Sequence, residues 1–143
     1  MKILLAIDDS KFSEAAAQSL AEQFRPQDTE VRVLHVVEPV AISEPPQMSP
    51  GYYPELEGRL PQAREVTGRA AKMLSSAGFR VTTSVATGDA RSIILDDAAE
   101  WHADLIVLGS HGRKGLGRFF LGSVSEAVAR HASCSVQIVR VPS

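Results

Sequence analysis

The chain has 143 residues, of which 44% are hydrophobic and 22% are charged, with a formal net charge of −2. This composition predicts one folded domain spanning 1–143 and excludes a disordered chain. The small net charge excludes binding driven by overall charge, so neither nucleic acid nor a membrane is expected as a partner. The first apolar run is too short for a signal segment or a membrane span. With a single cysteine there is no internal disulfide, and a cytoplasmic location is expected.

The N-terminal part of the chain predicts a strand, a helix and a second strand. The first strand is expected over residues 2–8 (KILLAID), a nearly continuous apolar run of the kind buried on both faces. Asp9 or Ser10 can cap the helix that follows. The second strand is expected over 31–37 (VRVLHVV), where His35 is interpreted as a core histidine with satisfied hydrogen bonds.

A proline-rich segment, residues 39–54, separates the second strand from a long helix. Its five prolines exclude regular structure there, because proline fixes φ and lacks an N–H. Apolar residues at steps of three and four then predict a helix from about residue 56 to 77, with Pro61 in its first turns. Gly78 is placed to end this helix at the C′ position.

The remaining segments continue the alternation of strands and helices. We expect strands over 79–85, 103–110 and 135–141, and helices over 90–102 and 123–131. Asp89 is a candidate cap for the first of these two helices. Strands separated by helices favour parallel pairing with right-handed crossovers. The predicted fold is α/β, a doubly wound (Rossmann-like) five-stranded parallel sheet with helices on both faces. Such sheets bind ligands beyond the carboxyl ends of their strands.

Residues 109–126, GSHGRKGLGRFFLGSVSE, link the fourth predicted strand to the last helix. Ser123 and Glu126 have the spacing of a capping box, which predicts a helix start with Ser123 as its N-cap. Backbone N–H groups and the helix dipole at such a start attract anions, and glycines let the backbone approach phosphate closely. Positive charge on the loop adds to this field, although which side chain contacts phosphate is left open (Arg113, Lys114, Arg118).

The spacing of three glycines carries a family resemblance. The P-loop and dinucleotide-binding patterns both fail here, because their lysine or their third glycine is missing. The pattern Gly109-x2-Gly112-x9-Gly122-Ser123 instead resembles the ATP-binding motif of the universal stress protein family. The resemblance covers essentially the whole chain, including KILLAIDDS at the start, LHVVEP in the second strand and the 38 residues from Ala103 to Arg140.

This resemblance implies a nucleotide site and a dimer. Asp8 would lie near the nucleotide, and its neighbours would line the adenine together with the end of the second strand (Ala6, Ile7, Val37). The loop after the fourth strand would support ribose and phosphates (Leu108, Gly109, His111, Gly112), and the start of the last helix would complete the phosphate cradle (Gly122, Ser123, Val124, Ser125). The resemblance further implies ATP as ligand with Mg²⁺ on its phosphates, and a homodimer through the C-terminal strand 135–141.

The residues alone leave simpler roles open for two of these positions: Asp8 as a turn residue and Ser123 as a helix cap. No nucleophile–base arrangement of a known kind is present, and His111 has no metal-spaced partner, so we predict no catalytic residues and no metal ligands. The expected function is ATP binding in stress response or signalling, without fast turnover. The alternatives are a slow ATP or adenine-nucleotide hydrolase with a metal at Asp8, and a dimeric interaction module whose segment 39–54 faces a partner.

Overall fold

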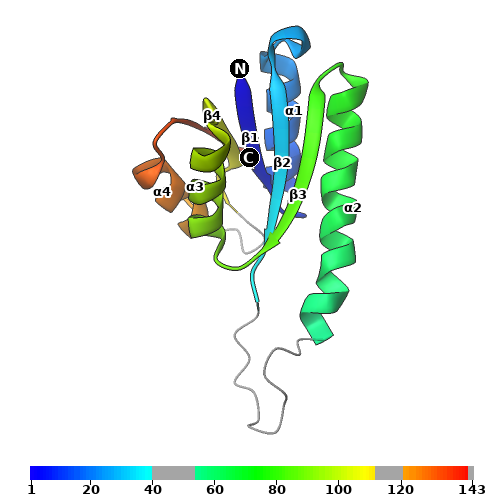
Figure 1. Cartoon of the computed structure of the whole chain (residues 1–143), viewed down its shortest axis with the longest axis vertical. Helices are drawn as coiled ribbons and strands as arrows, with labels where there is room; N and C mark the ends of the chain where they lie inside the picture. The colour runs from blue at the N-terminus through cyan, green and yellow to red at the C-terminus, as the bar shows by residue number, and fades with distance from the viewer. Residues whose placement is uncertain (40–53, 112–120, 142–143) are drawn as a thin grey trace, which may run out of the picture.

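Five parallel strands form one sheet in the order β3-β2-β1-β4-β5 (Figure 1). The computed structural model describes residues 1–39, 54–111 and 121–141. The strands are β1 (Lys2–Ile7), β2 (Glu30–Val37), β3 (Arg80–Thr87), β4 (Leu105–Gly109) and β5 (Ser135–Val139). The doubly wound α/β fold is confirmed, and the strand ends differ from the predicted ones by up to two residues.

Four α-helices connect these strands: α1 (Lys11–Gln23), α2 (Pro54–Ser76), α3 (Ala90–Trp101) and α4 (Ser123–His131). A 3₁₀ turn, Pro26–Asp28, lies between α1 and β2. Helix α2 begins at Pro54, two residues before its predicted start, because proline is tolerated at the first helical position, where no N–H is required. Pro61 lies inside α2.

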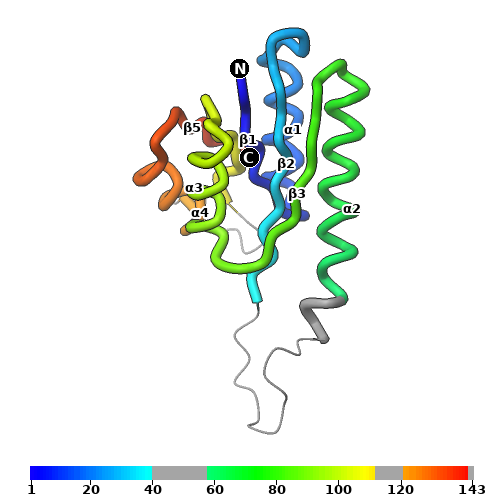
Figure 2. The backbone as a smooth tube through the Cα atoms, in the orientation of Figure 1, coloured from blue at the N-terminus to red at the C-terminus, as the bar shows by residue number. Residues whose placement is uncertain are grey.

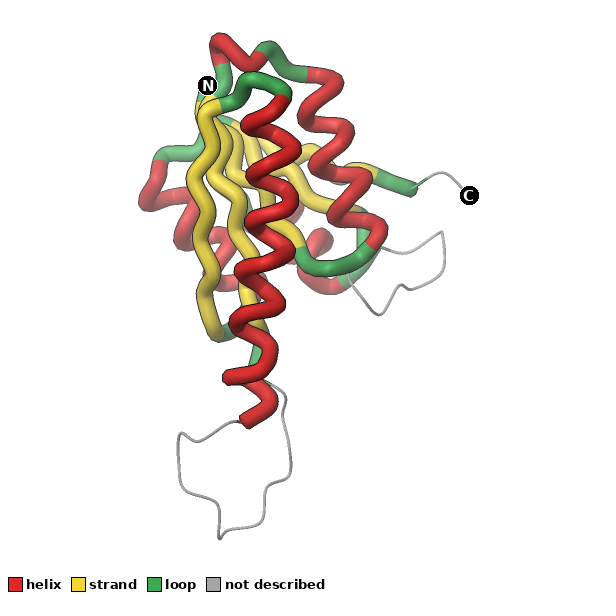
Figure 3. Tube along the Cα trace, turned by 90° about the vertical axis from the view of Figure 1, so that its right-hand side faces the viewer, coloured by secondary structure: helices red, strands yellow, loops and turns green. Residues whose placement is uncertain are grey.

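The helices cover the two faces of the sheet in pairs. Helices α1 and α2 lie on one face, in front of the strands in Figure 3, and α3 and α4 cover the other. The central strand β1 is buried on both faces because alternate side chains enter the two cores. Ile3 and Leu5 pack with α1 and α2, whereas Leu4 and Ala6 pack with α3 and α4.

Several predicted helix ends are confirmed. Ser10, not Asp9, is the N-cap of α1, and its side chain accepts from the Ser13 N–H. Asp89 is the N-cap of α3. Gly78 follows α2 with φ +100°, a left-handed conformation in which a side chain would be strained.

The carboxyl ends of the strands meet at one edge of the sheet, toward the lower end of the view in Figure 2. β1 and β4 are neighbours, as predicted. The chain leaves β1 for α1 on one face and leaves β4 for α4 on the other, so the strand order reverses between them. This is the point at which open α/β sheets bind ligands.

Candidate functional site

The predicted apolar residues of the site divide between the two faces of the sheet. Ala6 of β1 pairs with Leu108 of β4, and both are buried in the core beneath α3 and α4. Ile7, the next residue, packs into the opposite core. The side chains of Ala6 and Leu108 therefore lie together, while the side chain of Ile7 points to the other face. Val37, at the end of β2, is also buried.

Asp8 is held by the first turn of α1. Its backbone N–H donates to Ser13 Oγ at 2.7 Å, and its Oδ1 accepts from the Ser10 N–H and the Ser13 hydroxyl, both at 2.9 Å. These contacts fix the carboxylate at the edge of the sheet. Its second oxygen accepts no hydrogen bond within the part of the chain that the structure describes.

Gly109 lies directly against the backbone of α1. A Cβ at this position would stand 2.7 Å from the Cβ of Phe12 and 2.8 Å from its backbone C and O. These distances are shorter than any normal carbon contact, and backbone atoms cannot move aside by rotating a side chain. Gly109 is therefore required for the packing of α1 on β4, whatever its role toward a ligand.

His111 follows β4 and is half-buried. Its ring lies 5.2 Å from the Phe12 ring, between centroids, and its Nδ1 is 3.1 Å from Ser110 Oγ. Its Nε2 is buried and has no hydrogen-bond partner among the described residues. The ring is therefore fixed by Phe12 and Ser110, with one nitrogen available to a ligand or to a neighbouring segment.

The start of α4 differs from the prediction. Gly122, not Ser123, is the N-cap, and no side chain caps the helix among the residues described. The predicted capping box is wrong because Glu126 uses its N–H to bond Gly122 O and its carboxylate to pair with Arg130 at 3.1 Å. Ser123 is exposed at the first helical position, so its hydroxyl is not used as a cap.

Ser125 has a different environment from Ser123. It is only 2% exposed, and its Oγ donates to Ser110 O at 2.8 Å and lies 3.1 Å from Gly122 O. The Gly122 N–H also donates to Ser110 O at 2.8 Å. A Cβ on Gly122 would stand 3.3 Å from this oxygen and from His111 Cα, so glycine permits the close approach.

Helices α3 and α4 begin beside each other with different partners for their N–H groups. In α3, the Ala90 N–H donates to Glu38 Oε1 at 2.9 Å and the Ser92 N–H donates to Asp89 Oδ2 at 3.2 Å. The hydrogen bonds from Ser92 lower the pKa of Asp89. In α4, no such bond exists within the described ranges for the N–H groups of the first turn (Ser123, Val124, Ser125).

A cavity of about 390 Å³ lies between these two helix starts and the end of β2. It is lined by Glu38, Pro39, Gly88, Asp89, Arg91, Ser123 and Val124. Only Ser123 and Val124 belong to the site predicted from the sequence. Glu38 and Arg91 were missed, although their place directly after β2 and at the start of α3 follows from the predicted strand ends.

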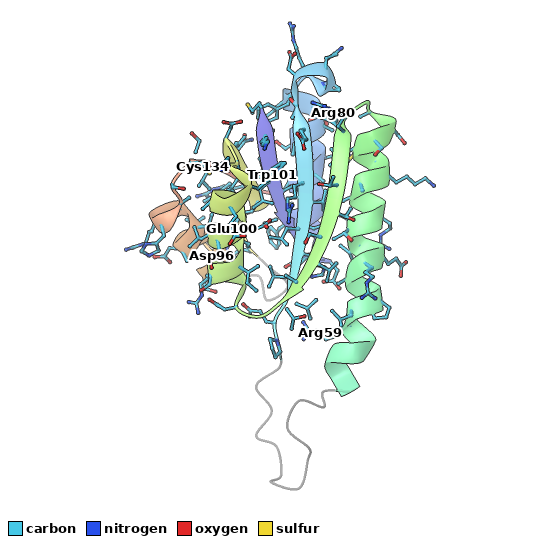
Figure 4. The ribbon with its side chains drawn as sticks, viewed as in Figure 1. Arg59, Arg80, Asp96, Glu100, Trp101 and Cys134 are labelled. Carbon is cyan, nitrogen blue, oxygen red and sulfur yellow. The ribbon has the colours of Figure 1, made fainter. Side chains whose placement is uncertain are left out.

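The N-terminal half of α2 closes the other side of the edge. Arg59 extends toward the end of β2, where its Nη1 donates to Glu38 O at 2.7 Å (Figure 4). Gln62 Nε2 donates to Asp9 Oδ2 at 3.3 Å, which ties α2 to the segment after β1.

His35 lies beneath these contacts. Its Nδ1 is buried and makes no hydrogen bond within the described residues, so the expectation of a satisfied core histidine is wrong for this atom. Burial lowers the pKa of His35, and the charge of Asp8, a backbone hydrogen bond at Ala63 and the charge of Asp9 oppose this shift only in part. Its place under the edge of the sheet therefore favours the neutral form of the ring.

Gly112 and the basic residues of the same loop lie outside the described residues (Arg113, Lys114, Arg118), as does most of the proline-rich segment. No group of three or more His, Cys, Asp or Glu side chains able to hold a metal occurs within 1–39, 54–111 and 121–141. None of the helices in these ranges is both long and apolar enough to cross a membrane.

The fold is that of a doubly wound α/β protein, with a candidate ligand site at its switch point. The chain belongs to the universal stress protein family, whose model matches residues 1–140. It is 32% identical to universal stress protein Sll1388 of Synechocystis in an alignment 151 positions long, which covers 97% of each chain. It is 33% identical to universal stress protein YxiE of Bacillus subtilis in an alignment 147 positions long, which covers 97% of this chain and 98% of the relative.

Solved structures of similar chains include universal stress protein UspA from Lactobacillus plantarum. It matches with a TM-score of 0.86 and 25% identity, over 98% of this chain and 97% of that one. A family member from Arabidopsis thaliana was solved with AMP bound, and it matches with a TM-score of 0.69 and 19% identity, over 100% of this chain and 93% of that one. A universal stress protein from Archaeoglobus fulgidus was solved in complex with dAMP (TM-score 0.69, 22% identity, 97% of both chains covered).

Proposed function

We propose that this universal stress protein binds ATP at the carboxyl edge of its sheet and acts as a nucleotide-dependent stress or signalling protein. The observation that carries the proposal is the start of α4, where three backbone N–H groups have no partner among the described residues and no side chain caps the helix. A phosphate is the ligand that such a helix start favours. The adenine nucleotides bound by the Arabidopsis and Archaeoglobus proteins support this choice.

The site offers a partner for each part of ATP. The phosphates would lie on the N–H groups of Ser123 and Val124, with the exposed Ser123 hydroxyl as a further donor. Asp8 would accept a hydrogen bond from the nucleoside through Oδ2. Mg²⁺ would be held mainly by phosphate oxygens, since the described residues supply no carboxylate cluster, and it would neutralise part of the phosphate charge.

Calorimetric titration with ATP, with and without Mg²⁺, tests the proposal. We expect saturable binding by the unmodified protein and its loss in the double variant Gly122→Val with Ser123→Ala. The valine would push against Ser110 O and His111 Cα, which stand only 3.3 Å from its Cβ. Ser133→Ala, an exposed serine beyond the end of α4, is the matched control and should bind normally. No heat at millimolar ATP with the unmodified protein would overturn the proposal.

We also propose that bound ATP turns over slowly. Asp8 is the acidic side chain that the family resemblance puts near the nucleotide, and its Oδ1 already accepts two hydrogen bonds. That oxygen is poorly placed to serve a metal or an attacking water. Release of phosphate should stay below about 1 s⁻¹, the low end of ordinary enzymes. A faster rate that disappears in Asp8→Asn would favour the alternative, an ATP or adenine-nucleotide hydrolase.

The edge strand β5 supports a homodimer. β5 pairs with β4 on one side and is the last strand of the sheet, so its other side presents backbone groups for pairing. Val139 O accepts from the Ser110 N–H, which directs Val139 toward β4 and, by alternation, directs the N–H of Ile138 outward. Ile138→Pro should therefore yield monomers in sedimentation experiments, while Ile138→Ala, which keeps the N–H, should remain dimeric. Dimers of both variants would refute this interface.

A further inference from the structure

Two buried groups attach the start of α4 to the end of β4. The carbonyl oxygen of Ser110 accepts the Gly122 N–H and the Ser125 hydroxyl, each at 2.8 Å. Both serines are almost completely buried, with 3% and 2% of their surface exposed. In a buried site a hydrogen bond to a carbonyl is strengthened by the low local dielectric, and the loss of one of the two leaves a lone pair of the oxygen without a partner.

The rest of the junction shows why this attachment matters. Gly122 is the N-cap of α4 and has no side chain to fix the turn. The Ser110 N–H donates to Val139 O at 2.9 Å, which anchors the acceptor itself to β5. Ser125 therefore joins the first turn of the helix to a rigid part of the sheet.

We propose that Ser125 is a positioning residue for the phosphate cradle: its hydroxyl holds α4 against Ser110 and so aims the N–H groups of Ser123 and Val124, without contacting the nucleotide. This inference rests on the proposed function, and it assigns to Ser125 a role different from the ligand contact that the family resemblance implied. The hydroxyl is directed into the junction, 2.8 Å from a backbone oxygen, and its 2% exposure leaves no surface for a phosphate.

The first measurement is amide hydrogen exchange in the protein without nucleotide. The Gly122 amide shares its acceptor with Ser125, so Ser125→Ala should speed its exchange about fivefold to tenfold, the effect of losing one hydrogen bond. Ser125→Thr keeps the hydroxyl and should leave the rate unchanged. Ser125→Cys, of similar size with a weak donor, should give an intermediate rate and serves if the threonine methyl disturbs folding. The Leu5 amide, in the core of β1, reports global unfolding, and it should exchange more slowly than the Gly122 amide in each variant because Gly122 opens locally.

The second measurement is ATP affinity by calorimetry in the same proteins. We expect Ser125→Ala to weaken binding by a similar factor and Ser125→Thr to restore it, while Ser133→Ala behaves as the unmodified protein. Weaker binding without faster Gly122 exchange would overturn the proposal, because it would indicate direct contact between the hydroxyl and the nucleotide. Faster exchange with unchanged affinity would overturn it as well. If the unmodified protein fails to bind ATP, the proposed function fails, and exchange alone then shows whether Ser125 holds the helix.

Discussion

Gly109 offers a test that separates packing from ligand binding, because its two interpretations predict different results in the absence of nucleotide. Gly109→Ala places a methyl group 2.7 Å from Phe12 Cβ and 2.8 Å from two backbone atoms of the same residue. Helix α1 must move away from β4 to accept it. Overpacking of this kind costs about 1 to 3 kcal/mol, and we expect the upper part of that range because backbone atoms are among the neighbours.

The assay is thermal and urea unfolding of the protein without nucleotide. For a chain of this length, about 3 kcal/mol corresponds to a fall in Tm of roughly 10 °C. Gly68→Ala is the matched control, since Gly68 lies exposed inside α2 with no atom within 4 Å of its added Cβ. It should raise stability by about 0.5 to 1 kcal/mol, because alanine favours the helix over glycine. Equal stability of Gly109→Ala and the unmodified protein would refute the packing argument and leave phosphate contact as the reason for the glycine.

Two further predictions concern charged and titratable side chains. His35→Gln should flatten the pH dependence of stability. Because burial lowers the pKa of His35 in the folded protein, the unfolded chain takes up the proton first, and the native protein loses stability as the pH falls below about 6.5. Urea unfolding between about pH 7.5 and 5.5 should show this loss only when the histidine is present. Arg32 and Asp97 form a bidentate ion pair, with Nε to Oδ2 at 2.9 Å and Nη2 to Oδ1 at 3.0 Å. A double-mutant cycle of Arg32→Ala and Asp97→Ala should give a coupling energy of about 1 kcal/mol. A coupling energy of zero at low salt would contradict this prediction.

The order of elements could be predicted from the sequence because it depends on local patterns. KILLAI, the sequence of β1, is apolar at every position but one. Helices α1 and α3 begin after residues with capping side chains, Ser10 and Asp89. The parallel sheet follows from the alternation itself. Family membership rests on the same features, read together with the glycine spacing.

The details of the site could not be predicted because they depend on residues far apart in the chain. Gly109 touches Phe12, and Glu38 reaches the Ala90 N–H across 52 positions of sequence. The spacing of Ser123 and Glu126 fits a capping box, but the position of the helix start is set by Ser110 O, which lies outside any local pattern. The phosphate role of the loop glycines is predicted from their spacing and their place before a helix start, and the structure adds a packing role for Gly109 and Gly122.

The two helix starts beside the cavity have opposite electrical character. At α3 the carboxylates of Glu38 and Asp89 accept from the N–H donors and outnumber the one guanidinium of Arg91, so that side of the cavity carries negative charge. At α4 the N–H groups of Ser123, Val124 and Ser125 have no partner among the described residues, so that side attracts negative charge. If the proposed function holds, a nucleotide would therefore be oriented in the cavity, with its phosphates toward α4 and its hydrogen-bond donors toward Glu38 and Asp89.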